Sequence, residues 1–148
     1  MSSVPTQNGP YMGAMLRVIW QWVREQIFNG VVAAGYDDLN PAHVGLFRYP
    51  TLDGLRPTEL ADQRQITKQS INDLLRHLEQ SGYLLRKIDP ADGRARIIRL
   101  TAQGRRLERI INSQAQAAEQ RIAEMLGNSR FTVLRNGLEE LADKVSKR

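Results

Sequence analysis

The sequence predicts a mainly α-helical fold with a small two-stranded β-sheet, and two observations carry this prediction. Apolar residues recur every three or four positions along most of the 148-residue chain, which is the spacing of one helix face. Two β-prone runs, residues 83–88 and 96–100, flank the polar turn DPADGRA and predict a hairpin. Hydrophobic residues make up 41% of the chain, so we expect one domain over residues 1–148 with a buried core.

Composition excludes several classes of protein. The sequence has no cysteine, which excludes disulfides, thiolate catalysis and cysteine-ligated zinc. The first ten residues, MSSVPTQNGP, lack the basic and apolar regions of a signal peptide. No apolar run approaches the roughly 18 residues that a membrane span needs. We therefore expect a cytoplasmic protein that has no membrane partner.

The N-terminal third predicts two helices after a disordered start over residues 1–10. The first helix begins at Tyr11 and runs to about Val32, and Gly35 follows it. The helical spacing of this segment is carried by Met12, Leu16, Ile19, Val23 and Ile27. Asn40 and Pro41 then begin a short helix over residues 41–49, with Val44 and Phe47 turned inward.

A short helix, a tight connection and a longer helix follow. Pro57 begins the short helix, and Leu60 and Ala61 point inward. Thr67 is a natural N-cap for the next helix, although Ser70 leaves the capping box incomplete. This helix extends to Gly82, which suits a left-handed C-terminal cap. The order is that of a helix-turn-helix.

Two further helices complete the chain after the hairpin. Thr101 caps a long helix that extends to about Leu126, and the residues GNS interrupt it. The last helix has apolar residues at alternating steps of three and four, as in a short coiled coil. These residues are Phe131, Leu134, Leu138, Leu141 and Val145.

The net charge of +5 is concentrated in the middle of the chain. Residues 56–106 hold eleven basic and six acidic side chains, whereas the two flanking segments are nearly balanced. A localised basic block is typical of a surface that binds a polyanion. Charge alone is explained equally well by an ordinary solvated surface.

The helix over residues 67–82 has two different faces. Its apolar face is formed by Ile71, Leu74, Leu75 and Leu78. The opposite face is polar, and it carries Gln69, Asn72, Asp73, Arg76 and Gln80. Gln, Asn and Arg side chains can make paired hydrogen bonds to base edges, and a helix N-terminus favours a phosphate. Any solvated helix is amphipathic, so the neighbouring turn and hairpin are what favour a DNA-reading helix.

The hairpin behind this helix is basic. Arg86 and Arg96 lie on its strands, where they can meet phosphates. Arg94 lies near the tip, from which it can enter the minor groove. We expect Asp89 and Asp92 to order the turn and to hold an arginine in place. The predicted DNA-binding residues are Thr67, Lys68, Gln69, Ser70, Asn72, Arg76, Arg86, Arg94 and Arg96.

The segment LADQRQITKQSINDLLRHLEQSGYLLRKIDPADGRARIIRLTAQG resembles the MarR family of winged-helix transcription regulators. The motifs LEQSGYLLR, DPADGRA and LTAQG occur in the family's order and spacing. The resemblance is specific over residues 57–107, and the flanking helices match in number and order. It implies a winged helix-turn-helix lobe over residues 41–100 and dimerisation helices over residues 11–35 and 101–148. The implied function is that of a homodimeric repressor of transcription that binds a pseudo-palindromic operator in double-stranded DNA.

Three positions depart from the family pattern. Arg94 matches the second arginine of the family's Asp-Arg-Arg wing tip, whereas Gly93 replaces the first. Gln65 stands where a glycine usually precedes the recognition helix, and Arg64 replaces an apolar residue.

The resemblance also raises the question of an effector, because the family often responds to small aromatic or phenolic anions. For each residue that could line such a cleft we favour a role in the core or in an interface. These residues are Tyr11, Arg17, Trp20, Trp22, Tyr36, His43 and Tyr49.

Other functions find less support in the sequence. Asp73 and His77 lie one helical turn apart and could offer two metal ligands, but nothing supplies a third, and His43 lies on a different element. No cofactor or nucleophile motif is present, so we expect no cofactor, no metal and no enzyme. The main alternative is a winged helix used for nonspecific DNA architecture or for protein contact. In that case, changing Gln69 or Asn72 would leave sequence preference unaltered.

Overall fold

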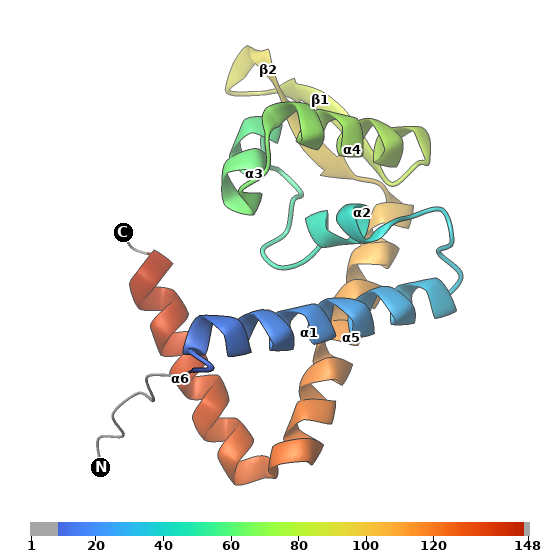
Figure 1. Ribbon diagram of the computed structural model, residues 1–148. Coiled ribbons are helices and arrows are strands. Elements are labelled where there is room, and N and C mark those ends of the chain that lie inside the picture. Colours follow the sequence, from blue (N-terminus) through green and yellow to red (C-terminus); the bar gives the residue numbers. More distant parts are fainter. Residues whose placement is uncertain (1–8, 147–148) are drawn as a thin grey trace.

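The computed structural model describes residues 9–146, and these residues form helices and strands in the predicted order (Figure 1). The predicted disordered start falls mainly on residues 1–8, which lie outside the described range. In chain order, the elements are α1 (Met12–Ala33), α2 (Pro41–Leu46), α3 (Pro57–Arg64), α4 (Lys68–Gln80), β1 (Leu84–Asp89), β2 (Asp92–Leu100), α5 (Ala102–Leu126) and α6 (Asn128–Ser146). None of the helices in this range is both long and apolar enough to cross a membrane.

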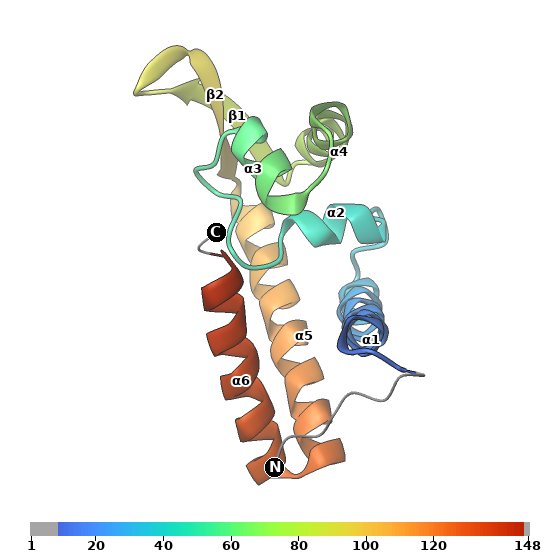
Figure 2. The same cartoon turned by 60° about the vertical axis from the view of Figure 1, so that its left-hand side comes forward.

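The elements form a lobe and a set of long helices. The lobe contains α2, α3, α4 and the β1–β2 hairpin, and α5 leads away from its base (Figure 1). α1 packs across α5, and α6 turns back from the far end of α5 at Gly127. The hairpin projects from the lobe as a wing (Figure 2).

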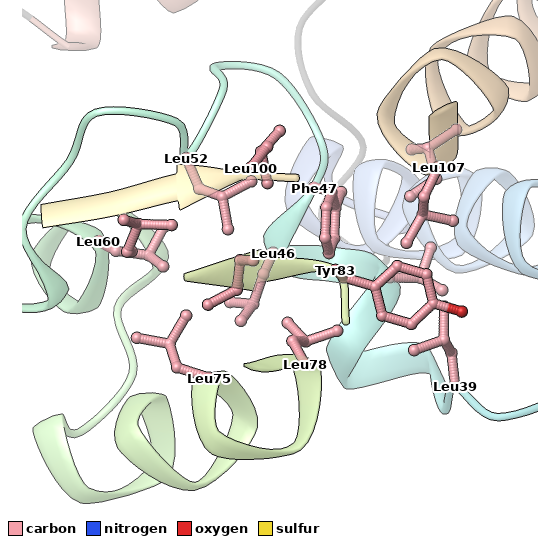
Figure 3. Close-up of a cluster of buried hydrophobic side chains, with 14 of the residues drawn as sticks. Leu39, Leu46, Phe47, Leu52, Leu60, Leu75, Leu78, Tyr83, Leu100 and Leu107 are labelled. Atoms are coloured by element: carbon pink, nitrogen blue, oxygen red, sulfur yellow. The ribbon is translucent and has the colours of Figure 1, made fainter. Parts of the chain in front are cut away.

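The core fills the space between α2, α3, α4 and the base of the wing. Leu60 of α3 and Leu75 and Leu78 of α4 point toward Leu46 of α2, and all four are buried (Figure 3). The predicted apolar face of α4 is therefore confirmed. Burial of each such leucine contributes roughly 1.5–3 kcal/mol. This packing holds α4 with its polar face outward.

Local hydrogen bonds set the ends of α4. Thr67 caps the helix as predicted, since its Oγ1 accepts from the Ser70 N–H at 3.1 Å. Gly82 has φ +87°, the left-handed conformation that was expected there. Gln65 has φ 54° although it is not glycine, and its side chain donates to the Asp62 carbonyl at 3.0 Å. The helix-turn-helix geometry is thus kept without the family's glycine.

The hairpin is longer than the sequence predicted. β1 and β2 are antiparallel, with Leu84 opposite Leu100 and Asp89 opposite Asp92. Most of the predicted turn DPADGRA therefore lies in strands, and this part of the prediction was wrong. Carboxylates close the turn, because Asp89 accepts from the Ala91 N–H at 2.9 Å and Asp92 from the Arg94 N–H at 3.0 Å. A run with Gly and Asp has low β propensity, which concealed the strand.

α2 is shorter than expected, ending at Leu46 rather than near Tyr49. Arg64, at the end of α3, supplies the reason. Its Nη2 donates to the carbonyls of Leu46, Arg48 and Pro50 at 3.3, 2.7 and 2.8 Å. A guanidinium can satisfy these carbonyls only where the chain leaves the helix. Burial lowers the pKa of Arg64.

Two apolar faces are left uncovered by the rest of residues 9–146. The first half of α1 exposes Met12, Met15, Leu16, Ile19 and Trp20. No residue of α6 is buried, and its apolar stripe exposes Val133, Leu134, Leu138, Leu141 and Val145. An apolar patch of this extent is typical of an interaction surface.

Candidate nucleic-acid interface

The first turn of α4 presents four of the predicted residues to solvent. Thr67, Lys68, Gln69 and Ser70 are exposed and adjacent to the free N–H groups of the helix N-terminus. The Thr67 hydroxyl also donates to Ser70 Oγ at 2.9 Å, so these two side chains are ordered together. This turn can meet an anion with backbone N–H groups and one lysine.

The next two turns of α4 present Asn72 and Arg76. Arg76 is exposed, and its guanidinium lies 3.2 Å from the Asp73 carboxylate one turn earlier. An exposed pair of this kind contributes only about 0.3–0.5 kcal/mol, so Arg76 is free to exchange Asp73 for another acceptor. Asn72 is half-buried, because it faces the wing.

Arg86 does not extend into solvent as the hairpin pattern suggested. Its Nη1 donates to Asn72 Oδ1 at 3.2 Å, and its Nη2 donates to Glu79 Oε1 at 3.3 Å. The backbone N–H of Arg86 also donates to Glu79 Oε2 at 3.3 Å. The structure thus brings Arg86 and Asn72 together, within a bridge between the wing and α4.

Arg94 and Arg96 are two of the exposed cations of the wing. Both side chains point to solvent, and neither forms an ion pair within residues 9–146. Arg94 lies next to the turn, and Arg96 lies opposite Ile88 on the stem. These positions fit a charged tip and a charged stem, as the sequence suggested.

The base of the turn is tied to the lobe by Asp89. Its Oδ2 accepts from Arg56 Nε at 2.9 Å and lies 2.7 Å from Arg56 Nη2. The Ala91 N–H and then Arg56 hold the pKa of Asp89 below its ordinary value. Asp89 therefore holds an arginine as expected, but that arginine precedes α3 instead of belonging to the wing.

A groove of about 740 Å³ lies between the start of α3, the outer side of α4 and the wing. Its lining is mostly basic and polar, with one acidic side chain. The lining residues are Arg56, Pro57, Thr58, Asn72, Glu79, Arg86, Ala95 and Arg96. Three of the predicted DNA-binding residues, Asn72, Arg86 and Arg96, therefore border one surface.

Comparison with known proteins shows which regulators this chain is similar to. The family model described as "MarR family" matches residues 38–95, which include α2, α3, α4 and β1. An HTH-type transcriptional repressor of Mycobacterium tuberculosis is 33% identical over 88 residues, covering 60% of this chain. A crystal structure of MarR has a TM-score of 0.79 and 25% identity, and the match covers 98% of this chain and 97% of that one. Over its helix-turn-helix lobe in sequence, and over nearly all of its length in fold, the chain is similar to regulators of the MarR family.

Regulators of the MarR family are DNA-binding transcription factors and not enzymes. The match to the mycobacterial repressor spans 63% of that protein, which is less than two thirds of its length. The repressor CouR, solved bound to a 23-mer DNA duplex, is 26% identical with a TM-score of 0.70, over 89% of this chain and 92% of that one. CouR from Rhodococcus jostii RHA1, solved with p-coumaroyl-CoA, shares the fold at 23% identity and a TM-score of 0.68, over 88% and 91% of the two chains.

Sequence reasoning missed two residues of this surface, Arg56 and Glu79. A signal for Glu79 was present, because it lies two turns from Asn72 along the same edge of α4. No comparable signal pointed to Arg56, whose partner Asp89 lies 33 residues away.

The side chains considered for an effector cleft lie in different surroundings. The guanidinium of Arg48 lies 4.3 Å from the ring centroid of Trp20. Burial, and then repulsion by Arg24 and Arg64, lowers the pKa of Arg48 to about 10. Tyr36 packs near Tyr83, with ring centroids 6.1 Å apart. Among the remaining candidates His43 is buried and Trp22 is half-buried, whereas Tyr11, Arg17 and Tyr49 are exposed.

The two histidines are stacked on each other, a contact that their sequence positions did not suggest. His77 Nε2 lies 2.8 Å from the Asp38 carbonyl oxygen, to which it donates. In the described part of the chain, no three His, Cys, Asp or Glu side chains are grouped so that they could hold a metal ion.

Proposed function

We propose that this chain is a sequence-specific repressor of transcription that acts on DNA as a homodimer in the cytoplasm. One observation carries the proposal: Asn72 of α4 and the exposed Arg96 of the wing line a single groove. The MarR-family likeness and the DNA-bound CouR structure support the same reading. A winged helix used for protein contact alone would not need an unpaired arginine beside the wing turn.

In the proposed mechanism, two copies of α4 enter major grooves about 34 Å apart, one duplex turn. Base edges are read by Gln69, Ser70, Asn72 and Arg76, which lie on the outer face of α4. Thr67 and Lys68 anchor phosphates at the helix N-terminus. Arg94 enters the flanking minor groove, and Arg96 meets a phosphate near the stem. Bound in this way, the dimer occludes a promoter.

The homodimer is proposed to form through residues 11–35 and 101–148, with residues 41–100 as the DNA-binding lobe of a single domain. Support comes from the uncovered apolar faces of α1 and α6. Burial of exposed apolar area contributes roughly 25 cal/mol per Å². Two copies that share these faces would set the spacing between their α4 helices.

Release by a small aromatic or phenolic ligand is part of the proposal. The likeness to CouR, solved with p-coumaroyl-CoA, supports a ligand-responsive regulator. The contact between Trp20 and Arg48 offers a ring and a cation, the two groups that an aromatic anion needs. We assign no further residue to such a site.

One experiment distinguishes sequence-specific binding from nonspecific DNA architecture. It selects bound sequences from a random duplex pool, with the wild type and with Gln69→Ala, and compares the two motifs. Gln69 is exposed and makes no contact with the core, so its loss leaves the fold intact. We expect Gln69→Ala to relax one position in each half-site. An identical motif for the two proteins would favour nonspecific DNA architecture, in which base-reading side chains have no role.

A further inference from the structure

Arg86 is held more firmly than the other wing arginines. Its backbone N–H and Nη2 donate to the two oxygens of Glu79, and Nη1 donates to Asn72. Its side chain is only 22% exposed. The negative charge of Glu79 also offsets the positive charge that a phosphate would require.

The contact fixes the orientation of the Asn72 amide. A guanidinium has five N–H donors and no acceptor, so the atom of Asn72 that faces Arg86 has to be its oxygen. The amide group is planar, and its nitrogen therefore points away from Arg86. Asn72 lies at the edge of the groove that borders the outer face of α4, so this nitrogen is the atom available to DNA.

We propose that Arg86 is a positioning residue for base recognition, which acts by holding Asn72 with its oxygen toward the wing and its N–H donors toward the DNA. This inference rests on the proposed function as a sequence-specific DNA-binding protein. Glu79 fixes Arg86 from the other side, and the three side chains form one unit across the wing and α4.

The base preference of Asn72 follows from this orientation. A free asparagine pairs with adenine by donating to N7 and accepting from N6. Here the oxygen is engaged by Arg86, so Asn72 acts as a donor alone. Acceptor atoms in the major groove are guanine O6 and N7, adenine N7 and thymine O4. We expect the base pair read by Asn72 to show no preference for adenine over guanine.

A phosphate-binding role for Arg86 makes a different prediction. Loss of a phosphate contact makes the slope of log affinity against log salt concentration less steep by about 0.9, and it weakens binding to all sequences alike. Loss of a positioning residue changes the preferred base at one position and leaves that slope unaltered. Motif and salt slope therefore separate the two roles.

The test uses full-length protein and measures the selected motif and the salt dependence of the affinity. The proteins compared are the wild type, Arg86→Ala, Asn72→Ala and the double variant. Arg96→Ala is the matched control, because Arg96 lines the same groove without an ion pair among the described residues. We expect Arg86→Ala to change discrimination at one base pair of each half-site by roughly tenfold. The double variant should discriminate there no worse than Asn72→Ala. Arg96→Ala should lower the salt slope and keep the motif.

A second variant keeps the test valid if Arg86→Ala, in which Glu79 loses its partner, does not fold. Asn72→Asp keeps an oxygen toward Arg86 and replaces the outward N–H donors with an acceptor. Its preference should move to a base that presents a donor, cytosine N4 or adenine N6. A motif unaltered in both Arg86→Ala and Asn72→Asp would overturn the positioning role alone. A wild type that selects no motif would overturn the proposed function and this role with it.

Discussion

The imidazole rings of His43 and His77 stack with centroids 4.2 Å apart and planes inclined by 17°. The contact joins α2 to α4. His43 also completes the cap of α2, since its Nδ1 accepts from the Asn40 N–H at 3.0 Å. The cap requires a neutral His43, because a protonated Nδ1 has no lone pair with which to accept. Burial, and then the neighbouring His77, lowers its pKa, while Asp38 acts in the opposite direction.

His43 should therefore make stability depend on pH. A histidine whose pKa is lower in the folded state binds more protons when unfolded, so its contribution is present above pH 6.5 and is lost as pH falls toward the folded pKa. We expect the free energy of unfolding in urea to decrease from pH 7 to pH 5. His43→Gln keeps an acceptor for the Asn40 N–H and should remove most of that dependence. An equal decrease in both proteins would assign the effect to other groups.

Gly104 should be essential to the junction between the wing and α5. A Cβ at this position would overlap the carbonyl oxygen of Tyr83, which is backbone and cannot move aside. We expect Gly104→Ala to lower the free energy of unfolding by about 1–3 kcal/mol. Gly93→Ala is the control, because a Cβ there meets no atom within 4 Å. Equal stability of the two variants in urea would contradict the close approach.

Arg94 should contribute to specific binding from the wing. Removal of its guanidinium in Arg94→Ala should cost about 1–3 kcal/mol of affinity for the preferred duplex, measured by fluorescence anisotropy. Gly93→Arg restores the first arginine of the family's wing tip, and a Cβ at this position meets no atom within 4 Å. This change should strengthen binding and increase the salt slope by about 0.9. An affinity unaltered in Arg94→Ala would remove Arg94 from the mechanism.

The apolar stripe of α6 should hold the dimer together. The wild type should scatter light with twice the chain mass at micromolar concentration. The double variant Leu138→Arg, Leu141→Arg would place two positive charges in this interface. We expect this variant to be a monomer. Asn136→Arg adds a charge to the polar side of α6, beside Glu139 and Glu140, and should leave the dimer intact. A wild type that scatters as a monomer would exclude this assembly.

Local sequence signals predicted the fold well because each acts over a few residues. The period of Ile71, Leu75 and Leu78 and the caps Thr67 and Thr101 sufficed to place two helices and their buried faces. The length of the wing was the exception. Propensity predicted a long turn, whereas hydrogen bonds to the carboxylates of Asp89 and Asp92 make the turn short.

Contacts between distant residues were beyond the sequence. Arg86 resembled a solvent-exposed stem cation, and only its approach to Asn72 and Glu79 gives it a different role. Arg64 likewise stands where an apolar residue was expected, and the three carbonyls that accept from its Nη2 explain how a half-buried guanidinium is accommodated there. The DNA contacts of Gln69, Arg76 and Arg94 stay predictions, since they depend on a partner molecule.

The most direct test of sequence-specific binding is in-vitro selection from a random duplex pool with the wild-type protein at two salt concentrations. We expect a pseudo-palindrome whose half-site centres lie about ten base pairs apart, enriched at both concentrations. Binding without an enriched motif, together with a steep loss of affinity at the higher salt concentration, would contradict specific recognition by α4.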